Sequence, residues 1–401
     1  MGTFGFSTDK LKKLESYLQE NYIDTNRYVG TLTGIYRNGQ LGFISPLGLM
    51  DRESRKLVER DTIFRIYSMT KPITSVALMS LYEKGLFQLD DPVSEYIPSF
   101  KDLKIYEEGI LGSYKTNYPD REMTIRDLLS HQSGLTYGFM ERTNVDAAYR
   151  ELGIEKESQE NLEEFVDVLS TIPLEFSPGT AWNYSVSTDV CGYLIEVISG
   201  KPLDSFLEEE IFQPLGMLDT GFYVPSIKTQ RLSSNYEYRE GKEPILIDDA
   251  HSGSYINPPT LLSGGGGLVS TLDDYMAFCK MILGRGSLEG HRILSRKTLD
   301  LMSSNHLTNG EDLRSCAYGR WSETSYTGVG FGLGFSVLLD PAASQVSGSK
   351  GELAWGGAAS TAFWIDPLED MAVVFLTQLI PSSTYNVRRE LRSLVYSALS
   401  D

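Results

Sequence analysis

The sequence has few cysteines, no long apolar run and a shortage of positive charge. Its three cysteines, Cys191, Cys279 and Cys316, lie far apart and form no C-x-x-C pair. This spacing argues against a disulfide framework or a zinc site, and free thiols suit a reducing compartment. No run reaches the roughly 20 apolar residues of a membrane span, and the first residues lack a signal peptide's apolar core and a complete myristoylation motif. We therefore expect a soluble, cytoplasmic protein.

Negative charge dominates the ionisable residues. Lysine and arginine total 36 against 54 aspartate and glutamate residues, which gives a formal net charge of −18. This balance argues against partners that present phosphate groups, so we expect neither nucleic acid nor an anionic membrane as a partner. A chain of 401 residues is long enough for two domains, or for one domain that carries a large insertion.

The N-terminal part combines helical and strand patterns. Leucines at helical spacing predict a helix over residues 8–22. Asn38-Gly39 between two strand-like runs predicts a β-hairpin, because both positions of its tight turn need positive φ. Residues 61–67, DTIFRIY, predict a further strand. The apolar residues after it predict a buried helix that ends at Gly85.

Helical patterns separated by Pro- and Gly-rich loops fill the middle of the chain, and strand patterns return near the C-terminus. The expected C-terminal elements are strands at 330–340, 351–366 and 371–379 and a helix near 386–399. Asp366-Pro367 marks a turn, so the last two strands are expected to pair as a hairpin. We predict an α+β fold with an antiparallel sheet flanked by helices, in a domain of residues 1–88 and 250–401, and an inserted, mainly helical domain of residues 89–249.

The segment RIYSMTKPIT carries the first candidate chemistry. Ser-x-x-Lys is a weak pattern by itself, since the chain contains it three times, starting at Ser7, Ser68 and Ser347. Only Ser68 lies between a predicted buried strand and a predicted buried helix. Pro72 fixes the start of that helix, because proline is tolerated only in the first turn. Lys71 then lies one turn after Ser68 on the same helix face.

This placement suits a nucleophile and its base. Unpaired backbone N–H groups and the positive end of the helix dipole would stabilise an alkoxide or a tetrahedral oxyanion at Ser68. Burial disfavours the charged form of a lysine, which would allow Lys71 to accept the serine proton. The alternative is that Ser68 is an ordinary helix cap and Lys71 a solvated first-turn residue. The segment alone does not decide between the two.

Three further segments are unusual. Tyr184 stands in a loop directly before an apolar helix, where a phenol can project into a cleft, with a packed structural aromatic as the alternative. The strand-like segment LAWGGAAS contains Gly356 and Gly357, which indicate either a close backbone approach or a bulge. The glycine run at 264–267 lacks the spacing of a phosphate-binding loop, and we interpret it as a tightly packed loop.

The order of these motifs resembles that of the serine β-lactamase and penicillin-binding protein superfamily. The segments LDDPVSEYIP, TIRDLLSHQSGLTYGF, FSPGTAWNYS, GGGGLVSTLDDYMAF and GFGLGFSV are similar to stretches of the family VIII carboxylesterases and their class C β-lactamase-like relatives. The resemblance extends over most of the chain and is specific when the segments are taken together. It implies the fold predicted above, and an activity that needs no metal and no cofactor.

The resemblance assigns catalytic roles to three side chains. Ser68 would be the nucleophile. Lys71 and Tyr184 would form the base system, and Tyr184 would also return the proton to the leaving group. The backbone N–H groups of Ser68 and Ala358 would form the oxyanion hole.

The same resemblance suggests residues of the substrate pocket. Tyr137 and Trp355, together with Gly356 and Gly357, would line the acyl or alcohol pocket, although Tyr137 is equally compatible with a structural role. His131 invites a Ser-His-Asp interpretation, but the chain contains no Gly-x-Ser-x-Gly elbow. We therefore expect His131 to be structural.

Two departures from the family pattern bear on the substrate. β-Lactamases of this type have Tyr-x-Asn and Lys-Thr-Gly, whereas this chain has Tyr184-Ser185-Val186 and Trp355-Gly356-Gly357. This chain therefore lacks the asparagine amide and the lysine cation of those motifs. Their loss removes binding partners for an anionic lactam and favours a neutral ester as substrate. We expect a carboxylesterase that cleaves small-molecule esters of short to medium acyl chains through an acyl-enzyme on Ser68. The alternatives are a β-lactamase or D-amino-acid peptidase, an acyltransferase with the same residues, and an inactive module that only binds.

Overall fold

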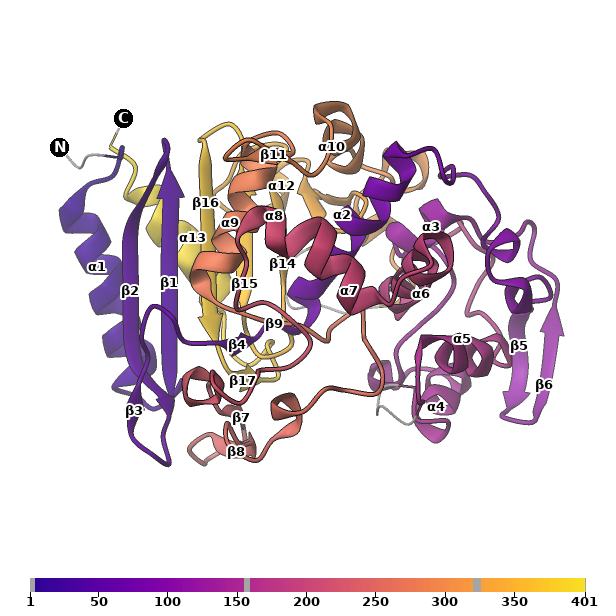
Figure 1. The fold of residues 1–401 in the computed structure, drawn as a ribbon, viewed down its shortest axis with the longest axis horizontal. Helices are drawn as coiled ribbons and strands as arrows, with labels where there is room; N and C mark the ends of the chain where they lie inside the picture. The colour runs from indigo at the N-terminus through magenta and orange to yellow at the C-terminus, as the bar shows by residue number, and fades with distance from the viewer. Residues whose placement is uncertain (1–3, 155–158, 320–325, 401) are drawn as a thin grey trace.

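A large antiparallel sheet organises the half of the molecule that contains both chain ends (Figure 1). The computed structural model describes residues 4–154, 159–319 and 326–400. The sheet runs in the order β12-β13-β14-β15-β16-β1-β2-β3, and all neighbouring strands in it are antiparallel. In that order the strands are Val329–Phe331, Ser336–Leu338, Leu353–Gly356, Ala362–Asp366, Met371–Thr377, Gly30–Arg37, Gln40–Asp51 and Lys56–Leu57.

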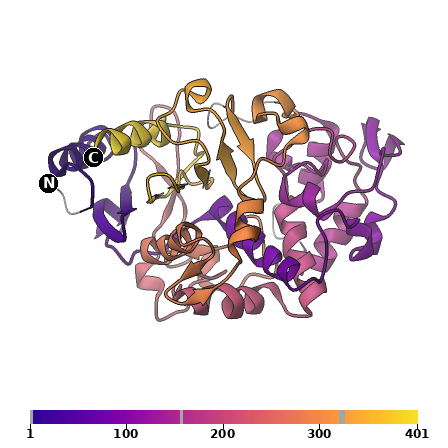
Figure 2. The same ribbon diagram turned by 90° about the horizontal axis from the view of Figure 1, so that it is seen from above.

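Helices cover both faces of this sheet, and alternate side chains of β16 supply the two cores. Val374 and Leu376 belong to the core that includes α2, α6 and α9, whereas Val373 and Phe375 belong to the core that includes α1 and α13. Figure 2 shows α1 and α13 lying together near the two chain ends. These five helices are α1 Thr8–Leu18, α2 Thr70–Glu83, α6 Ser187–Ser199, α9 Leu272–Leu283 and α13 Val387–Ser397.

Short helices dominate the part of the molecule farthest from α1 in Figure 1. A hairpin of β5 and β6 lies at its outer edge, while β7 and β8 form a separate small sheet with β17 from the C-terminal part of the chain. The strands are β5 Ile105–Ile110, β6 Ser113–Asn117, β7 Asn235–Glu237, β8 Ile245–Asp248 and β17 Leu379–Ile380. The remaining α-helices are α3 Ile125–Leu129, α4 Asn144–Glu151, α5 Leu162–Ser170, α7 Leu203–Leu207, α8 Gln213–Leu215, α10 Arg296–Met302, α11 Leu313–Cys316 and α12 Pro341–Ser344.

Several local predictions are confirmed. Asn38 and Gly39 both have positive φ and join β1 to β2, and β15 and β16 form the predicted hairpin. The α2 side chains from Thr70 to Leu81 are buried on every side of the helix. All three cysteines are free thiols. No helix among the described residues is long and apolar enough to span a bilayer.

Three predicted strands are shorter or divided in the structure. The strand expected over 61–67 contracts to β4, Phe64–Arg65, which pairs with β9, Val269–Ser270. The segment 330–340 forms two strands, because the chain turns at Gly334 with φ of +103°. The segment 351–366 likewise divides into β14 and β15, separated by a turn at 357–361. In each case a tight turn interrupts a run whose residue types alone suit a continuous strand.

Candidate active site

Ser68 lies in a short 3-10 turn, Tyr67–Met69, directly before α2. Tyr67 has φ of +43°, in the left-handed region, which turns the chain out of β4 and into the helix. Ser68 lines a cavity of about 770 Å³. This volume falls in the range of pockets that enclose small organic ligands.

The predicted triad comes together around the Ser68 hydroxyl. Tyr184, which precedes α6, donates a hydrogen bond of 2.6 Å to Ser68 Oγ. Lys71 Nζ lies 3.2 Å from the same oxygen. The lysine side chain is buried, and it also donates to Tyr137 Oη at 2.9 Å and to the Gly265 carbonyl at 2.6 Å. Ser68 therefore has both a phenol and an amine within proton-transfer distance.

Aromatic rings surround the Tyr184 phenol. The Trp355 ring centroid lies 5.4 Å from that of Tyr184, and the His131 ring centroid 5.1 Å. Burial raises the pKa of Tyr184 above its ordinary value, opposed in part by hydrogen bonding with Ser68 and Trp355. Tyr184 is therefore a neutral phenol near pH 7. Burial and the nearby Lys71 charge lower the pKa of His131, so this imidazole is also neutral.

The two glycines after Trp355 allow a close backbone approach. Of the two interpretations of this segment, a close approach or a bulge, the structure therefore favours the first. A Cβ atom on Gly357 would lie 2.4 Å from the Ile66 carbonyl oxygen and 2.3 Å from Thr361 Oγ1. Gly357 therefore packs directly against the segment that leads into Ser68. The next residue, Ala358, lines the same cavity as Ser68, and its N–H has no acceptor among the described residues.

Asp189 is a buried carboxyl group that our sequence interpretation missed. It accepts hydrogen bonds from Ser263 Oγ at 2.5 Å and from the Gly265 N–H at 3.0 Å. Burial raises the pKa of Asp189, and the Lys71 charge opposes this rise. A Cβ on Gly265 would lie 2.4 Å from Asp189 Oδ2, so the glycine run is tightly packed, as predicted. The sequence signal that could have identified Asp189 was a single acidic residue in the first turn of an otherwise apolar helix.

Arg388 of α13 is the second residue that was missed. Its Nη2 donates to the carbonyl oxygens of Gly357 and Thr361, both at 2.8 Å. Burial lowers the pKa of this guanidinium to about 10. Arg388 thus holds both ends of the turn that contains Ala358. No local pattern distinguishes Arg388 from its neighbour Arg389 in the sequence.

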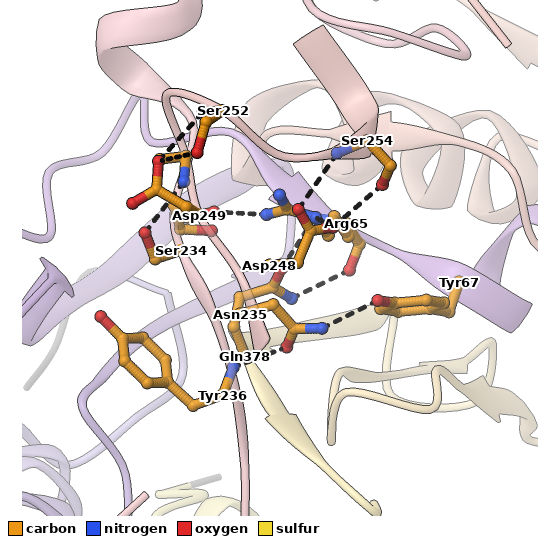
Figure 3. A network of polar contacts seen from close by, with 12 residues as sticks. Arg65, Tyr67, Ser234, Asn235, Tyr236, Asp248, Asp249, Ser252, Ser254 and Gln378 are labelled. Atoms are coloured by element: carbon orange, nitrogen blue, oxygen red, sulfur yellow. Dashed lines mark hydrogen bonds and ion pairs between the residues drawn. The ribbon is translucent and has the colours of Figure 1, made fainter. Parts of the chain in front are cut away.

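A polar network fixes the segment that leads into Ser68 (Figure 3). The Arg65 backbone N–H donates to Gln378 Oε1 at 3.2 Å, and Gln378 Nε2 returns a bond to the Arg65 carbonyl at 3.0 Å. The fully buried Arg65 side chain forms an ion pair of 2.9 Å with Asp248. Asn235 Nδ2 donates to Tyr67 Oη at 2.8 Å. Asp248 of β8 and Gln378, which follows β16, therefore hold Arg65, while Asn235 of β7 holds the strained Tyr67 directly before the serine.

The Arg65–Asp248 pair gives a stability prediction. Asp248→Ala should lower the free energy of unfolding by about 3–5 kcal/mol, because it leaves a buried guanidinium without its carboxylate. Asp273→Ala is the matched control, since it breaks the Arg60–Asp273 pair, whose side chains are 58% and 46% exposed. The control should cost about 1 kcal/mol or less. Urea unfolding of both variants measures the difference, and equal losses would contradict the prediction.

The cavity wall is mainly apolar. Tyr137, Gly356 and Gly357 line it together with Ser68, Tyr184 and Ala358. Trp355 is not among the described lining residues and instead packs against Tyr184. Apolar side chains complete much of the wall: Phe139, Ile154, Phe165, Val186, Leu261 and Ile380. None of the described lining residues is lysine or arginine, and Asp189 is the carboxyl group among them.

Two features define a β-lactamase and penicillin-binding protein type of fold. One is the antiparallel sheet with helices on both faces. The other is a serine directly before a buried helix, with a lysine one turn later. The Beta-lactamase family model matches residues 15–396, and the chain belongs to this family. Protein Rv1367c of Mycobacterium tuberculosis is 33% identical over 361 residues, 89% of this chain and 88% of that protein. Esterase EstB of Burkholderia gladioli is 30% identical over 374 residues, 88% of this chain and 86% of that protein.

A solved structure shares this fold over almost the whole chain. EstCE1, described as a hydrolase with promiscuous acyltransferase activity, superposes with a TM-score of 0.81. It is 29% identical in sequence, and the match covers 97% of this chain and 99% of that chain. The predicted fold class is confirmed.

Proposed function

We propose that the protein is a carboxylesterase that cleaves neutral esters of short to medium acyl chains through an acyl-enzyme on Ser68. The observation that carries this proposal is the position of Ser68 Oγ, 2.6 Å from the Tyr184 hydroxyl and 3.2 Å from Lys71 Nζ. The family relationship to the esterase EstB and the likeness to the hydrolase EstCE1 support an ester substrate.

The reaction follows from these contacts. In the neutral amine form of Lys71, which burial favours, Ser68 Oγ attacks the ester carbonyl carbon while its proton moves to Lys71, and the N–H groups of Ser68 and Ala358 stabilise the oxyanion. The tetrahedral intermediate then breaks its bond to the alkoxy oxygen. Tyr184, a neutral phenol, gives its proton to the departing alcohol and regains one from Lys71. Water enters by the same proton path and releases the carboxylic acid from Ser68.

The cavity wall supports a neutral substrate. A lactam antibiotic carries a carboxylate, and none of the described lining residues offers a cation to it. An apolar wall instead gains by covering an acyl chain or an uncharged alcohol. Transfer of the acyl group to an alcohol in place of water uses the same residues, and the description of EstCE1 makes it the second candidate.

The first experiment compares p-nitrophenyl butyrate with nitrocefin and follows the protein by intact-mass spectrometry. We expect rapid butyrate hydrolysis, a transient butyryl adduct on the protein, and feeble nitrocefin turnover. A series of longer acyl chains defines the size limit, and added alcohols reveal acyl transfer as ester product. Fast nitrocefin turnover without butyrate hydrolysis would make the β-lactamase alternative correct.

Gly357→Ala tests the proposed oxyanion hole. The added methyl group cannot fit against the Ile66 carbonyl and Thr361, so the turn must move and carry the Ala358 N–H with it. Because losing one oxyanion donor costs about 10²- to 10³-fold, kcat should fall by about 10²-fold. The control is Gly221→Ala, where the nearest atom to the added Cβ is 3.7 Å away and the residue lies outside the cavity. Unchanged kcat in folded Gly357→Ala would contradict this role for Ala358.

A further inference from the structure

A second hollow lies across the sheet from the catalytic cavity, between β14 and α13. Side chains alternate along β14, so Leu353 packs into the core that includes α2 while Ala354 packs toward α13. The facing positions carry small residues: Ala354 and Ala362 leave space beneath the helix, whereas the Arg388 guanidinium packs against Gly356. The hollow has a volume of about 120 Å³.

Three arginines of α13 line this hollow. They are Arg388, Arg389 and Arg392, and Glu352 is the one carboxyl group among its described lining residues. Arg392 forms an ion pair with Glu352, whose other oxygen accepts a hydrogen bond from Tyr396. The described lining therefore carries more positive than negative charge, although the chain as a whole has a net charge of −18.

Arg389 is the cation best placed to bind a ligand. Its Nη2 donates to the Gln345 carbonyl at 2.9 Å, and it makes no ion pair with any described residue. The guanidinium group is only partly buried, so a solute can approach it from the open side of the hollow. Apolar surface lies next to it, from Ala354, Ala362, Val346 and the ring of Trp364, on which Arg392 stacks at 4.8 Å.

We propose that this hollow binds a short-chain carboxylate. The planar guanidinium of Arg389 matches the two oxygens of a carboxylate, and the apolar wall beneath α13 covers the hydrocarbon chain. A volume of about 120 Å³ is somewhat smaller than the roughly 150 Å³ of a cavity that holds benzene, which suits a chain of only a few carbons. Inorganic phosphate would leave the apolar wall uncovered, and an uncharged alcohol would bring no negative charge to Arg389.

One side chain, Arg388, would connect a bound carboxylate to the catalytic site. Arg388 lines the hollow and also donates to the Gly357 carbonyl, next to Ala358. Carboxylic acids of this size are the products that a short-chain esterase releases. This link rests on the proposed function, whereas binding itself does not.

The binding test uses the full chain and titrates sodium butyrate by isothermal calorimetry, with sodium chloride, sodium phosphate and 1-butanol as comparison solutes. We expect saturable binding of butyrate alone. Arg389→Gln should weaken it about tenfold or more, since the bidentate, charge-assisted pair with the carboxylate is lost. Val346→Trp should also weaken it by filling the hollow. Arg296→Gln, an exposed arginine at the start of α10, is the matched control and should bind like the wild type.

Crystals soaked in 4-bromobutyrate locate the site independently of affinity. Anomalous bromine density between α13 and β14, absent in Arg389→Gln, is the expected result. Density only beside Ser68, equal butyrate affinity in wild type and Arg389→Gln, or no saturable binding would overturn the proposal. Phosphate binding as tight as butyrate binding would overturn the carboxylate assignment. None of these outcomes depends on ester hydrolysis, so failure here and failure of the esterase proposal are distinguishable.

Discussion

Ser68→Ala is expected to lower kcat/KM for p-nitrophenyl butyrate by at least about 10⁴-fold, the order found when a serine nucleophile is removed. Its hydroxyl oxygen is the atom that both Tyr184 and Lys71 contact, and alanine leaves no atom there to carry the acyl group. Intact-mass spectra of the variant should therefore show no butyryl adduct at any time. The fold should persist, because the serine packs at the surface of the cavity and its loss removes no core side chain.

The chain supplies its own control for this experiment. Ser347 also precedes a lysine by three positions, but it stands in an exposed turn. Ser347→Ala should hydrolyse the ester at the wild-type rate. Wild-type activity in Ser68→Ala would mean that the serine is only part of the turn before α2 and that hydrolysis occurs elsewhere.

Tyr184→Phe is expected to lower kcat by about 10²- to 10⁴-fold, the contribution of a positioned general acid or base. The change removes one oxygen and keeps the ring contacts with Trp355 and His131. Without the phenol, the departing alcohol has no proton donor 2.6 Å from Ser68 Oγ. Esters with a poor leaving group should lose more activity than p-nitrophenyl esters, whose leaving group needs little protonation.

Tyr137→Phe is the matched control for Tyr184→Phe, because the same oxygen is deleted from a neighbouring ring. Tyr137 Oη contacts Lys71 Nζ at 2.9 Å. Its loss should cost about tenfold or less, as for one ordinary hydrogen bond. Single-turnover measurements on both variants separate acylation from release of the acid. Equal losses in the two variants would contradict a distinct proton-donating role for Tyr184.

Local sequence patterns predicted those features whose cause is local. The Asn38-Gly39 turn and the buried α2 follow from the conformational preferences of a few adjacent residues. The proximity of Ser68 and Lys71 follows from helix geometry in the same way. The meeting of this pair with Tyr184 did not follow from spacing, and only the family resemblance anticipated it.

Features that depend on distant contacts were missed. Arg388 is separated from Gly357 by the whole of β15, β16 and β17, and its role becomes visible only when α13 is packed on the sheet. Asp189 looks like an ordinary first-turn acid until the glycine run folds over it. The strand predicted over 61–67 is wrong for a related reason, since the left-handed turn at Tyr67 receives a hydrogen bond from the distant Asn235 as well as local support.

The pairing of the first strand with a late one has a consequence for synthesis of the protein. Arg37 pairs with Met371, so β1 emerges from the ribosome long before its partner exists. At translation rates of about 5–20 residues per second, the delay is roughly 20 to 70 seconds. During this time one edge of the β1–β2 hairpin exposes its backbone N–H and C=O groups to other chains. Nascent chains are therefore most vulnerable to aggregation before β16 is made, and truncation upstream of β16 should yield insoluble protein.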